Sequence, residues 1–331
     1  MNDKHYDVVG IGSAIVDILS RTDENFLERH NMVKGTMALI DPDQAKALYR
    51  DMGRTMNISG GSAANSMAGI ASLGGRPAFI GKIGGDEFGE IFNHAIKAAG
   101  VDFHAGAKGT TKLPTAMCLI LVTGDAQRTM NTYLGACTEL SAADIDEGMI
   151  SAAHVTYIEG YQWDTPQAKD AIRKACVTAK VAGRKVALSL SDPFVVDRHR
   201  DDLLKLIFEH VDLLFGNEEE VFRLYQTTDF DTAVRKLRQS NTLACMTLGA
   251  RGALVVDVMS TATVPAAPVS KVVDTTGAGD LFAAGFLYGY TNGRDLVSSA
   301  KIGALAAAEI ISHMGARPEA DLRKLMVKEG L

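Results

Sequence analysis

The sequence predicts an α/β fold in which helices cover both faces of a central, mostly parallel sheet. Short apolar runs rich in β-branched residues, typical of buried strands, alternate along the chain with longer amphipathic stretches typical of helices. Alternation on this scale favours parallel strands joined by helices. The chain has 331 residues, 47% of them hydrophobic and 22% charged, which is enough for a large buried core.

The expected elements begin with a strand over 6–12, from the apolar run "YDVVGIG", and a helix over 61–74, from "GSAANSMAGIASLG". An amphipathic helix over 86–100 is closed by Gly100. Further strands are expected at 77–84, 154–161, 185–191, 211–217, 244–249 and 253–258, and further helices at 165–183, 200–210, 217–225 and in the apolar stretches near the C-terminus. Sites in such folds lie at the carboxyl ends of the strands.

Two segments interrupt this alternation. Residues 18–41 are expected to form short strands, and within residues 108–136 the sequence predicts a hairpin that turns at "TGDAQ" (123–127). Pairing of the two segments would make a small β lid over the site, and the alternative is two ordinary surface hairpins. No linker, low-complexity tract or internal repeat divides the chain, so residues 1–331 are expected to form a single domain.

Composition and charge argue against several classes of protein. A net charge of −6 gives no basic face for nucleic acid. No apolar stretch approaches the ~20 residues of a membrane span, and the N-terminus has no signal-peptide pattern, so we expect a cytoplasmic protein without membrane partners. The four cysteines are widely separated and the eight histidines show no HxH or HExxH spacing, which predicts free thiols and no histidine metal site.

The stretch "DTTGAGD" (274–280) stands between an apolar run and an expected helix. Gly277, Ala278 and Gly279 would leave bare backbone N–H groups at the positive end of the helix dipole, and such a hole binds phosphate. Asp280 would repel a phosphate that simply stayed bound, so we expect it to hold, as a base, the alcohol that receives a phosphoryl group. The alternative is a glycine-rich helix cap. There is no GxxxxGK[ST], which excludes a P-loop.

A second group of candidates lies near the N-terminus. Asp17 follows the first strand, and its carboxylate can accept two hydrogen bonds from the vicinal diol of a sugar, although a solvated loop residue is the alternative. Gly61 opens a helix that carries Asn65 one turn in, which suits a ligand rich in hydroxyls or a helix packed tightly on the sheet. "GIGSAIVD" lacks the third glycine of a dinucleotide fingerprint, which argues against NAD.

Asn217 ends an expected strand, and Glu220 lies three residues later in the first turn of the next helix. An amide and an acid at this point suit a hydrated Mg²⁺ ion. An N-cap residue and its capping-box partner fit the same spacing equally well. The stretch "TLGARGA" (247–253) is typical of a turn that lines a nucleotide pocket, or of a simple hairpin.

Together these motifs resemble those of the PfkB, or ribokinase-like, family of carbohydrate and nucleoside kinases. "DTTGAGDLFAAGFL" (274–287) resembles the family's C-terminal signature, and "GGSAANSMAGIASLGG" (60–75) with "IGKIGGDEFG" (80–89) resembles the N-terminal one. "NEEE" (217–220) matches the NxxE motif between them. The resemblance covers essentially the whole chain.

Within the family the chain is most similar to the adenosine kinase branch, through "LSLSDPFVV" (188–196), "GKIGGDEFGEIF" and "IEGYQW". Ser13 and Asp192 depart from that branch near the expected substrate side, which leaves base specificity open. Thr276 replaces a usual Asn that the family signature tolerates.

The resemblance implies a ribokinase-like three-layer α/β/α sandwich with a small β lid. It makes Asp280 the catalytic base, and the N–H groups of Gly277, Ala278 and Gly279 the anion hole for the γ-phosphoryl group. Arg128 in the lid hairpin would neutralise transition-state charge, although a solvated surface Arg is an equal alternative. The implied substrate contacts are Asp17, Gly61, Asn65, Ser13, Met37 and Leu134, and the implied ATP and Mg²⁺ contacts are Asn217, Glu220, Thr247, Gly249, Gly252 and Thr275, with Glu220 reaching the metal through water.

The resemblance also raises two questions that the sequence leaves open. Met37, Met117, Leu134 and Trp163 are apolar residues that would enclose a base, or would pack in the core. Some relatives are activated by K⁺ near the anion hole, where Asp274 and Gly315 are the candidate residues here.

The sequence therefore predicts an ATP- and Mg²⁺-dependent phosphotransferase that acts on the 5′-OH of a nucleoside, with adenosine as the first candidate. A sugar kinase of the ribokinase or fructokinase type is the alternative within the family. A ligand-binding protein without activity is less favoured, because binding alone needs no base. The sequence is compatible with a monomer or a homodimer.

Overall fold

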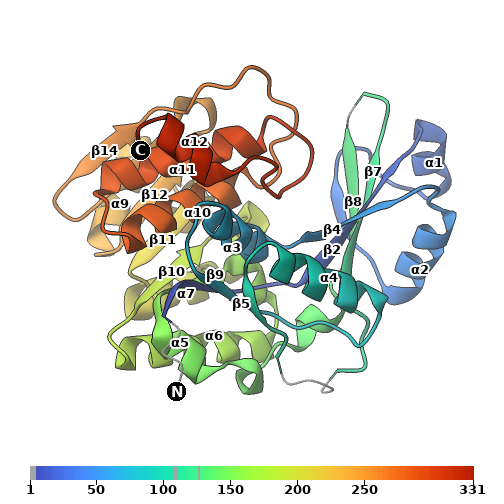
Figure 1. Cartoon of the computed structure of the whole chain (residues 1–331), viewed down its shortest axis with the longest axis horizontal. Helices are drawn as coiled ribbons and strands as arrows, with labels where there is room; N and C mark the ends of the chain where they lie inside the picture. The colour runs from blue at the N-terminus through green and yellow to red at the C-terminus, as the bar shows by residue number, and fades with distance from the viewer. Residues whose placement is uncertain (1–4, 107–110, 126) are drawn as a thin grey trace.

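A nine-stranded sheet forms the centre of residues 5–106, 111–125 and 127–331, the part of the chain that the computed structural model describes (Figure 1). Its strand order is β14-β13-β12-β11-β10-β9-β1-β5-β6. Pairs from β12 to β6 are parallel and the last two, β12 to β14, are antiparallel, as the sequence predicts. The strands are β1 (Tyr6–Ile11), β5 (Pro77–Ile80), β6 (Asp102–His104), β9 (Ala153–Glu159), β10 (Lys185–Ser189), β11 (Leu213–Asn217), β12 (Leu243–Thr247), β13 (Ala253–Val256) and β14 (Thr261–Val264).

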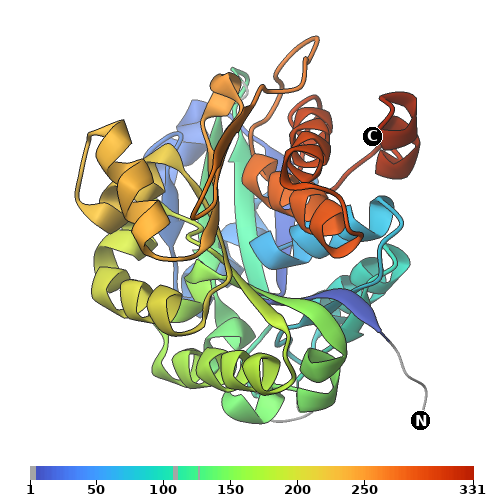
Figure 2. The same ribbon diagram turned by 90° about the vertical axis from the view of Figure 1, so that its left-hand side faces the viewer.

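Helices cover both faces of this sheet, which confirms the three-layer α/β/α sandwich (Figure 2). Val8 and Val9 show the reason, because successive strand residues point to opposite faces and both are fully buried, in different cores. Val8 shares its core with α3 (Ser62–Ser72), α4 (Glu87–Ala98), α10 (Ala278–Thr291), α11 (Leu296–Ile310) and α12 (Leu322–Lys328). Val9 shares its core with α5 (Glu147–Ala152), α6 (Pro166–Val181), α7 (Pro193–His210), α8 (Glu218–Tyr225) and α9 (Phe230–Gln239).

A smaller sheet stands beside the sandwich (Figure 1). Its order is β3-β8-β7-β2-β4, and its strands are β2 (Ile15–Arg21), β3 (Met37–Leu39), β4 (Met56–Gly60), β7 (Ala116–Val122) and β8 (Arg128–Tyr133). Helices α1 (Glu24–Arg29) and α2 (Pro42–Asp51) pack on one of its faces through Leu27, Ala45 and Leu48.

Both segments expected to form a lid, 18–41 and 108–136, contribute strands to the small sheet. Residues 108–110 and 126 of the second segment lie outside the described residues. Two expectations need correction. Residues 24–29 form a helix, because Asp23 caps it by accepting the N–H of Phe26 at 2.8 Å. Strand β4 lies outside both segments and is not among the expected strands, although its sequence "MNISG" alternates apolar Met56 and Ile58 with polar Asn57 and Ser59.

The helix expected over 200–210 begins earlier, at Pro193. Asp192 caps it by accepting the N–H of Phe194 at 2.6 Å, and proline is favoured at a first helical position. His199 departs from helical backbone with φ −126°, so the expected range matches only the second part of α7.

Register decides which side chains of the small sheet share the face of Asp17. Paired residues point the same way, so one row across the sheet is Leu39, Thr132, Cys118, Asp17 and Ile58. The next row is Met37, Met130, Ile120, Leu19 and Met56. We call these two rows the Asp17 face. It is apolar except for Asp17 and Thr132, and Met37, Leu39 and Met56 are 50, 61 and 56% exposed.

Close contacts between small residues fix α10 against its neighbours. A Cβ atom on Gly285 of α10 would lie 2.6 Å from the Cα atom of Gly303 in α11. On the opposite side, a Cβ atom on Gly69 of α3 would lie 2.6 Å from Leu281 and 2.7 Å from Ala284. Helix α10 therefore sits tightly between α3 and α11, and this contact sets the position of its first turn.

Replacing Gly285 by Ala is expected to destabilise the protein. Overpacking costs about 1–3 kcal/mol and outweighs the ~1 kcal/mol that Ala gains over Gly as a helix former. Gly53→Ala is the matched control, since a Cβ atom there meets nothing within 4 Å. Urea unfolding of both variants measures the difference, and equal stability would contradict the tight α10–α11 contact.

Candidate active site

The motif 274–280 spans the end of the loop before α10 and the first residues of that helix. Gly277 has φ +80°, a left-handed conformation that ends the preceding loop, and the helix begins at Ala278. A Cβ atom on Gly277 would lie 2.9 Å from that of Ala316, whereas one on Gly279 would meet nothing within 4 Å. The N–H groups of a first helical turn have no partner within the helix. The open space at Gly279 therefore lets an anion approach them closely.

Asp280 is held by side chains of α3, the helix that packs beside α10. Ser62 Oγ donates to Asp280 Oδ1 at 2.6 Å, Asn65 Nδ2 donates to Oδ2 at 3.0 Å, and Ser66 Oγ donates to the backbone carbonyl of Asp280 at 3.0 Å. Burial raises the pKa of Asp280, while Ser62, Asn65 and the charge of Arg317 oppose that rise. A fixed carboxylate with a raised pKa is suited to accept a proton.

Asp17 faces the same region from β2 of the small sheet. A Cβ atom on Gly60 would lie 2.4 Å from Asp17 Oδ2, so the carboxylate lies directly against β4. Burial raises the pKa of Asp17 to about 7; Arg317 and Arg128 oppose this rise, and Asp280 adds to it. The charge interactions indicate that Asp17 and Asp280 belong to one electrostatic site.

Gly61 joins β4 to α3 and permits a close approach of the β1–β2 connection. Its φ is +94°, and a Cβ atom would lie 2.1 Å from the carbonyl oxygen of Ser13. Only glycine fits there without moving one of the two segments. Gly61 thus places Asn65, and the rest of the first turn of α3, opposite Asp280.

Arg128 lies at the start of β8 and reaches the loop before α10. Its Nη2 lies 2.6 Å from Asp274 Oδ2, with side chains 11 and 7% exposed, and its Nη1 donates to Thr276 Oγ1 at 3.3 Å. The ion pair joins the small sheet to the segment that leads into the anion hole. Asp274, and not solvent, is therefore the partner of the lid arginine in this structure.

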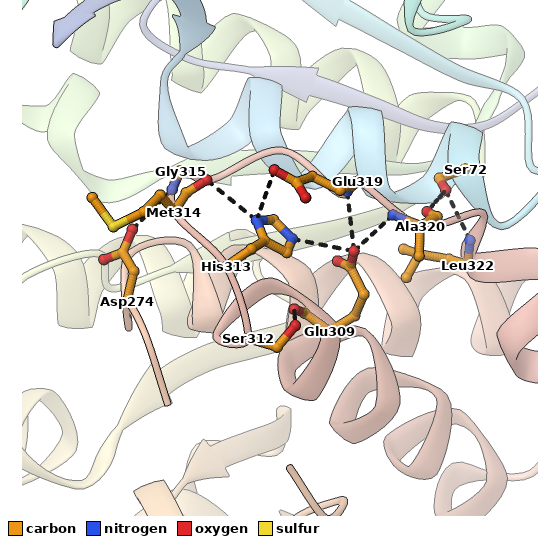
Figure 3. A network of polar contacts seen from close by, with 10 residues as sticks. All are labelled: Ser72, Asp274, Glu309, Ser312, His313, Met314, Gly315, Glu319, Ala320 and Leu322. Carbon is orange, nitrogen blue, oxygen red and sulfur yellow. Dashed lines mark hydrogen bonds and ion pairs between the residues drawn. The ribbon is translucent and has the colours of Figure 1, made fainter. Parts of the chain in front are cut away.

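The segment after α11 is also fixed at this site. Figure 3 shows Glu309 Oε1 accepting the N–H of Ala320 at 2.8 Å, and Asp274 Oδ2 accepting the N–H of Gly315 at 2.9 Å. These contacts anchor both ends of a loop that carries Arg317. Asp274 and Gly315, the candidates for a cation site, are thus in contact, and K⁺ binding there stays a prediction.

Asn217 and Glu220 form a complete capping box at the start of α8. Glu220 Oε2 accepts the N–H of Asn217 at 2.9 Å, Glu220 Oε1 accepts from Asn217 Nδ2 at 2.8 Å, and Asn217 Oδ1 accepts the N–H of Glu220 at 2.9 Å. Burial raises the pKa of Glu220 to about 7, and the charges of Asp192, Glu219 and Asp280 add to the rise.

No group of three His, Cys, Asp or Glu side chains able to hold a metal lies within the described ranges. The single carboxylate of Glu220 therefore suits a Mg²⁺ ion only if water and phosphate oxygens supply the other ligands. Mg²⁺ keeps several waters and takes phosphate oxygens as ligands, so a single nearby carboxylate such as Glu220 is enough to orient it.

The other expected nucleotide contacts cluster at the end of β12. Thr247 is its last residue, Gly249 has φ +58°, and Gly252 has φ +93° with room for no Cβ atom, since one would lie 2.1 Å from the carbonyl oxygen of Val264. Thr275 is exposed in the loop before α10. Thr247 pairs with Asn217, so the turn that carries Gly249 and Gly252 follows directly from the strand end beside Asn217.

The expected substrate contacts differ in how accessible they are to a ligand. Met37 lies on the Asp17 face, and Leu134 is half-buried just after β8. Ser13 is buried, and its hydroxyl accepts from Gln162 Nε2 at 2.7 Å. Met117 and Trp163, 7 and 1% exposed, lie within the two cores, which favours packing over stacking on a ligand.

Two charged residues of the site were missed by sequence reasoning. Glu159 ends β9, is fully buried, and accepts the N–H groups of Ser13 and Ala63 at 2.7 and 2.9 Å, which fixes the start of α3. It lies in "IEGYQW", but nothing in that stretch reveals its partners. Arg317 lies near the C-terminus, outside every motif, and donates from Nε to the carbonyl of Ser59 at 2.9 Å.

The fold and the grouping of these residues define a phosphotransferase for hydroxyl-bearing small molecules. A model of the pfkB family of carbohydrate kinases matches residues 29–322, and the chain belongs to that family. Kinases of this kind use ATP with Mg²⁺ in general. The helices of the described ranges are all too short or too polar to cross a bilayer.

The chain is similar to solved and curated kinases over nearly its whole length. It is 47% identical to the adenosine kinase of Sinorhizobium meliloti, with a TM-score of 0.90 and coverage of 98% of this chain and 100% of that one. It is 44% identical to a probable sugar kinase of Rhizobium etli CFN 42, with a TM-score of 0.91 and coverage of 98 and 99%. It is 28% identical over 330 residues to the adenosine kinase of Saccharomyces cerevisiae, covering 93 and 95%.

A double-mutant cycle on Arg128 and Asp274 is expected to give a coupling of about 1–3 kcal/mol, because both side chains are largely buried. The control is the surface pair of Arg223 and Asp197, at 2.9 Å with side chains 50 and 45% exposed, where the coupling should stay below about 0.5 kcal/mol. Urea unfolding of the single and double Ala variants gives both values. Equal coupling for the two pairs would show that Arg128 does not tie the small sheet to the α10 loop.

Proposed function

We propose that this protein is an ATP-dependent kinase that phosphorylates the 5′-hydroxyl of a nucleoside, with adenosine as the first candidate. The observation that carries the proposal is the fixed carboxylate of Asp280 beside the open backbone at Gly279, with Asp17 on an apolar face nearby. An anion site and a base at one helix start suit phosphoryl transfer. A carboxylate within an apolar face suits a ribose that carries a base.

The Asp17 face supports a nucleoside over a free sugar. Asp17 can accept both hydroxyls of the ribose diol, with Gly61 and Asn65 beside it. The exposed side chain of Met56 lies on the strand next to Asp17. Those of Met37 and Leu39 extend the same apolar face to its far edge at β3, a surface that a free sugar would not cover. A flat heteroaromatic base would bury it.

The chemistry follows from the positions of these groups. Asp280 holds the 5′-OH, whose oxygen forms a bond to the γ-phosphorus while the bond from phosphorus to the β–γ bridging oxygen breaks; ADP leaves with that electron pair, and the proton passes to Asp280. The N–H groups of Gly277, Ala278 and Gly279 stabilise charge on the moving phosphoryl group. Arg128 of the small sheet donates to Thr276, which directly precedes Gly277, and its charge would help to neutralise the phosphoryl group.

Nucleotide and metal would be held at the neighbouring edge of the sheet. Asn217 and Glu220 would orient Mg²⁺ through its waters, and Thr247, Gly249, Gly252 and Thr275 would line the ATP pocket. The metal supplies charge neutralisation on the phosphates when bound. The small sheet acts as a lid that excludes water, which limits transfer of the phosphoryl group to water.

A sugar kinase of the same family is the second candidate. The similarity to the Rhizobium etli probable sugar kinase, at 44% identity against 47% for the adenosine kinase of Sinorhizobium meliloti, favours keeping this candidate. Asp280 and the anion site would act in the same way, and only the acceptor would differ.

The substrate is tested by ADP release from the purified protein with MgATP across adenosine, inosine, guanosine, cytidine, ribose, fructose and fructose 6-phosphate. We expect turnover on adenosine, and a loss of about 10²-fold or more in Asp280→Asn, because the base is gone. Adenosine binding by calorimetry should persist in that variant. Activity confined to a free sugar would move the assignment to the second candidate, and turnover undiminished in Asp280→Asn would refute the base.

Gly279→Ala separates the anion site from folding. Alanine is accommodated in the fold, because a Cβ atom there meets nothing within 4 Å, and it is the better helix former. The methyl group would occupy the space of the phosphoryl oxygens, so kcat should fall by about 10²-fold. The melting temperature should equal or exceed that of the unaltered protein. A fully active Gly279→Ala variant would place the anion elsewhere.

A further inference from the structure

Arg317 is a charged residue without an assigned role. It lies in the loop after α11, and its guanidinium bridges two elements of the site. Nε donates to the carbonyl of Ser59 in β4 at 2.9 Å, and Nη1 donates to the carbonyl of Ala64 in α3 at 2.5 Å. Its third nitrogen, Nη2, is buried and has no hydrogen-bond partner among the described residues. A buried, unpartnered N–H of a charged group calls for a functional explanation.

The two carbonyls place the guanidinium between the acids. Ser59 precedes Gly60, whose backbone lies against Asp17 Oδ2. Ala64 precedes Asn65, which donates to Asp280 Oδ2. Arg317 is therefore tied on one side to the strand that touches Asp17 and on the other to the helix that holds Asp280.

Asp17 and Asp280 are both half-buried, and two partly desolvated carboxylates that share one site are stabilised in their charged forms by a nearby cation. Arg128 is a poor candidate, because Asp274 already pairs with it at 2.6 Å. Arg317 has no carboxylate partner of its own within ion-pair distance in the described ranges. The other ionisable groups whose charges act on Asp17 or Asp280, or are acted on by them, are Arg128, Cys118, Tyr157, Tyr161 and Glu220.

We propose that Arg317 is a charge-balancing, positioning residue that lets Asp17 and Asp280 be ionised together in the substrate site. Its catalytic consequence rests on the proposed function, because an ionised Asp280 is what accepts the proton and an ionised Asp17 is what accepts the diol. Its electrostatic part concerns the folded protein alone.

The direction of the charge effects agrees with the geometry. Arg317 lowers the pKa of both Asp17 and Asp280, against the rise caused by burial. Burial in turn lowers the pKa of Arg317 to about 10, and the two acids oppose that fall, so the guanidinium remains charged at neutral pH. Without this cation both carboxyl pKa values rise, and each acid takes up a proton at a higher pH than before.

The pH dependence of kcat tests the catalytic part. In Arg317→Gln the acidic limb of the profile should move to higher pH by about one unit, which corresponds to a tenfold loss near pH 6 that shrinks towards pH 8.5. Arg317→Lys, which keeps the charge, should keep the limb of the unaltered protein. Arg235→Gln on α9, an exposed residue, is the control. A uniform loss at every pH in Arg317→Gln would overturn the proposal, because a merely structural role lowers the whole profile.

A stability cycle tests the electrostatic part without any activity. Arg317→Gln should lower the urea midpoint more at pH 8 than at pH 5.5, since burial already raises the pKa of Asp17 to about 7 and the uncompensated carboxylate is charged mainly at the higher pH. The loss at pH 8 should shrink when Asp17→Asn is present. Equal losses at both pH values and in both backgrounds would overturn the proposal. If no substrate is turned over, the proposed function fails and this cycle still decides the role of Arg317. If Arg317→Gln does not fold, Arg317→Met, which removes the charge but keeps a long apolar side chain, takes its place in the same cycle with Asp17→Asn.

Discussion

The site depends on the contact between the first turns of α3 and α10. Asp280 begins one helix and takes its hydrogen bonds from Ser62 and Asn65 at the start of the other. These residues are more than two hundred positions apart, and only close packing of the two helices brings them together. Gly69 allows that packing, because any side chain there would collide with Leu281 and Ala284. The small residues of α3 thus serve packing and chemistry at once.

The second constraint is that several carboxylates of the site lie wholly or partly away from solvent and must be stabilised there. The protein stabilises each of them in a different way. Glu159 accepts the backbone N–H groups of Ser13 and of Ala63, so its side chain, which comes from β9, caps the start of α3. Glu220 is matched within its own capping box. The Asp280 carboxylate accepts two hydrogen bonds, as many as that of Glu220 accepts, whereas Asp17 accepts none from the described residues, and both aspartates are also influenced by nearby charges. Asp17, the acid without a fixed hydrogen bond among the described residues, is the one expected to accept the substrate diol, and its lone pairs are available for it.

Much of the fold and part of the site could be predicted from the sequence, because their signals are local. The alternation of apolar runs and amphipathic stretches predicts the sandwich, and the glycine run before Asp280 predicts the helix start that the structure has at Ala278, while the anion site itself stays a proposal. Strand β4 was missed because its alternation extends over only five residues, too short a run to stand out; in the structure it pairs with β2. Arg317 was out of reach for another reason: its partners Ser59 and Ala64 are 258 and 253 positions away, and no local pattern marks a residue whose contacts are all distant.

The link between the small sheet and the base has a mechanical consequence. Strand β4 leads through Gly61 directly into α3. Gly61 packs against the carbonyl oxygen of Ser13 so closely that no side chain would fit there. Ser62, the next residue, holds Asp280. An outward movement of the small sheet would therefore displace the start of α3 and weaken the hydrogen bonds from Ser62 and Asn65 to the Asp280 carboxylate. Under the proposed function, proton abstraction by Asp280 therefore requires the small sheet to be in its closed position, and in the open position water would meet a misaligned base.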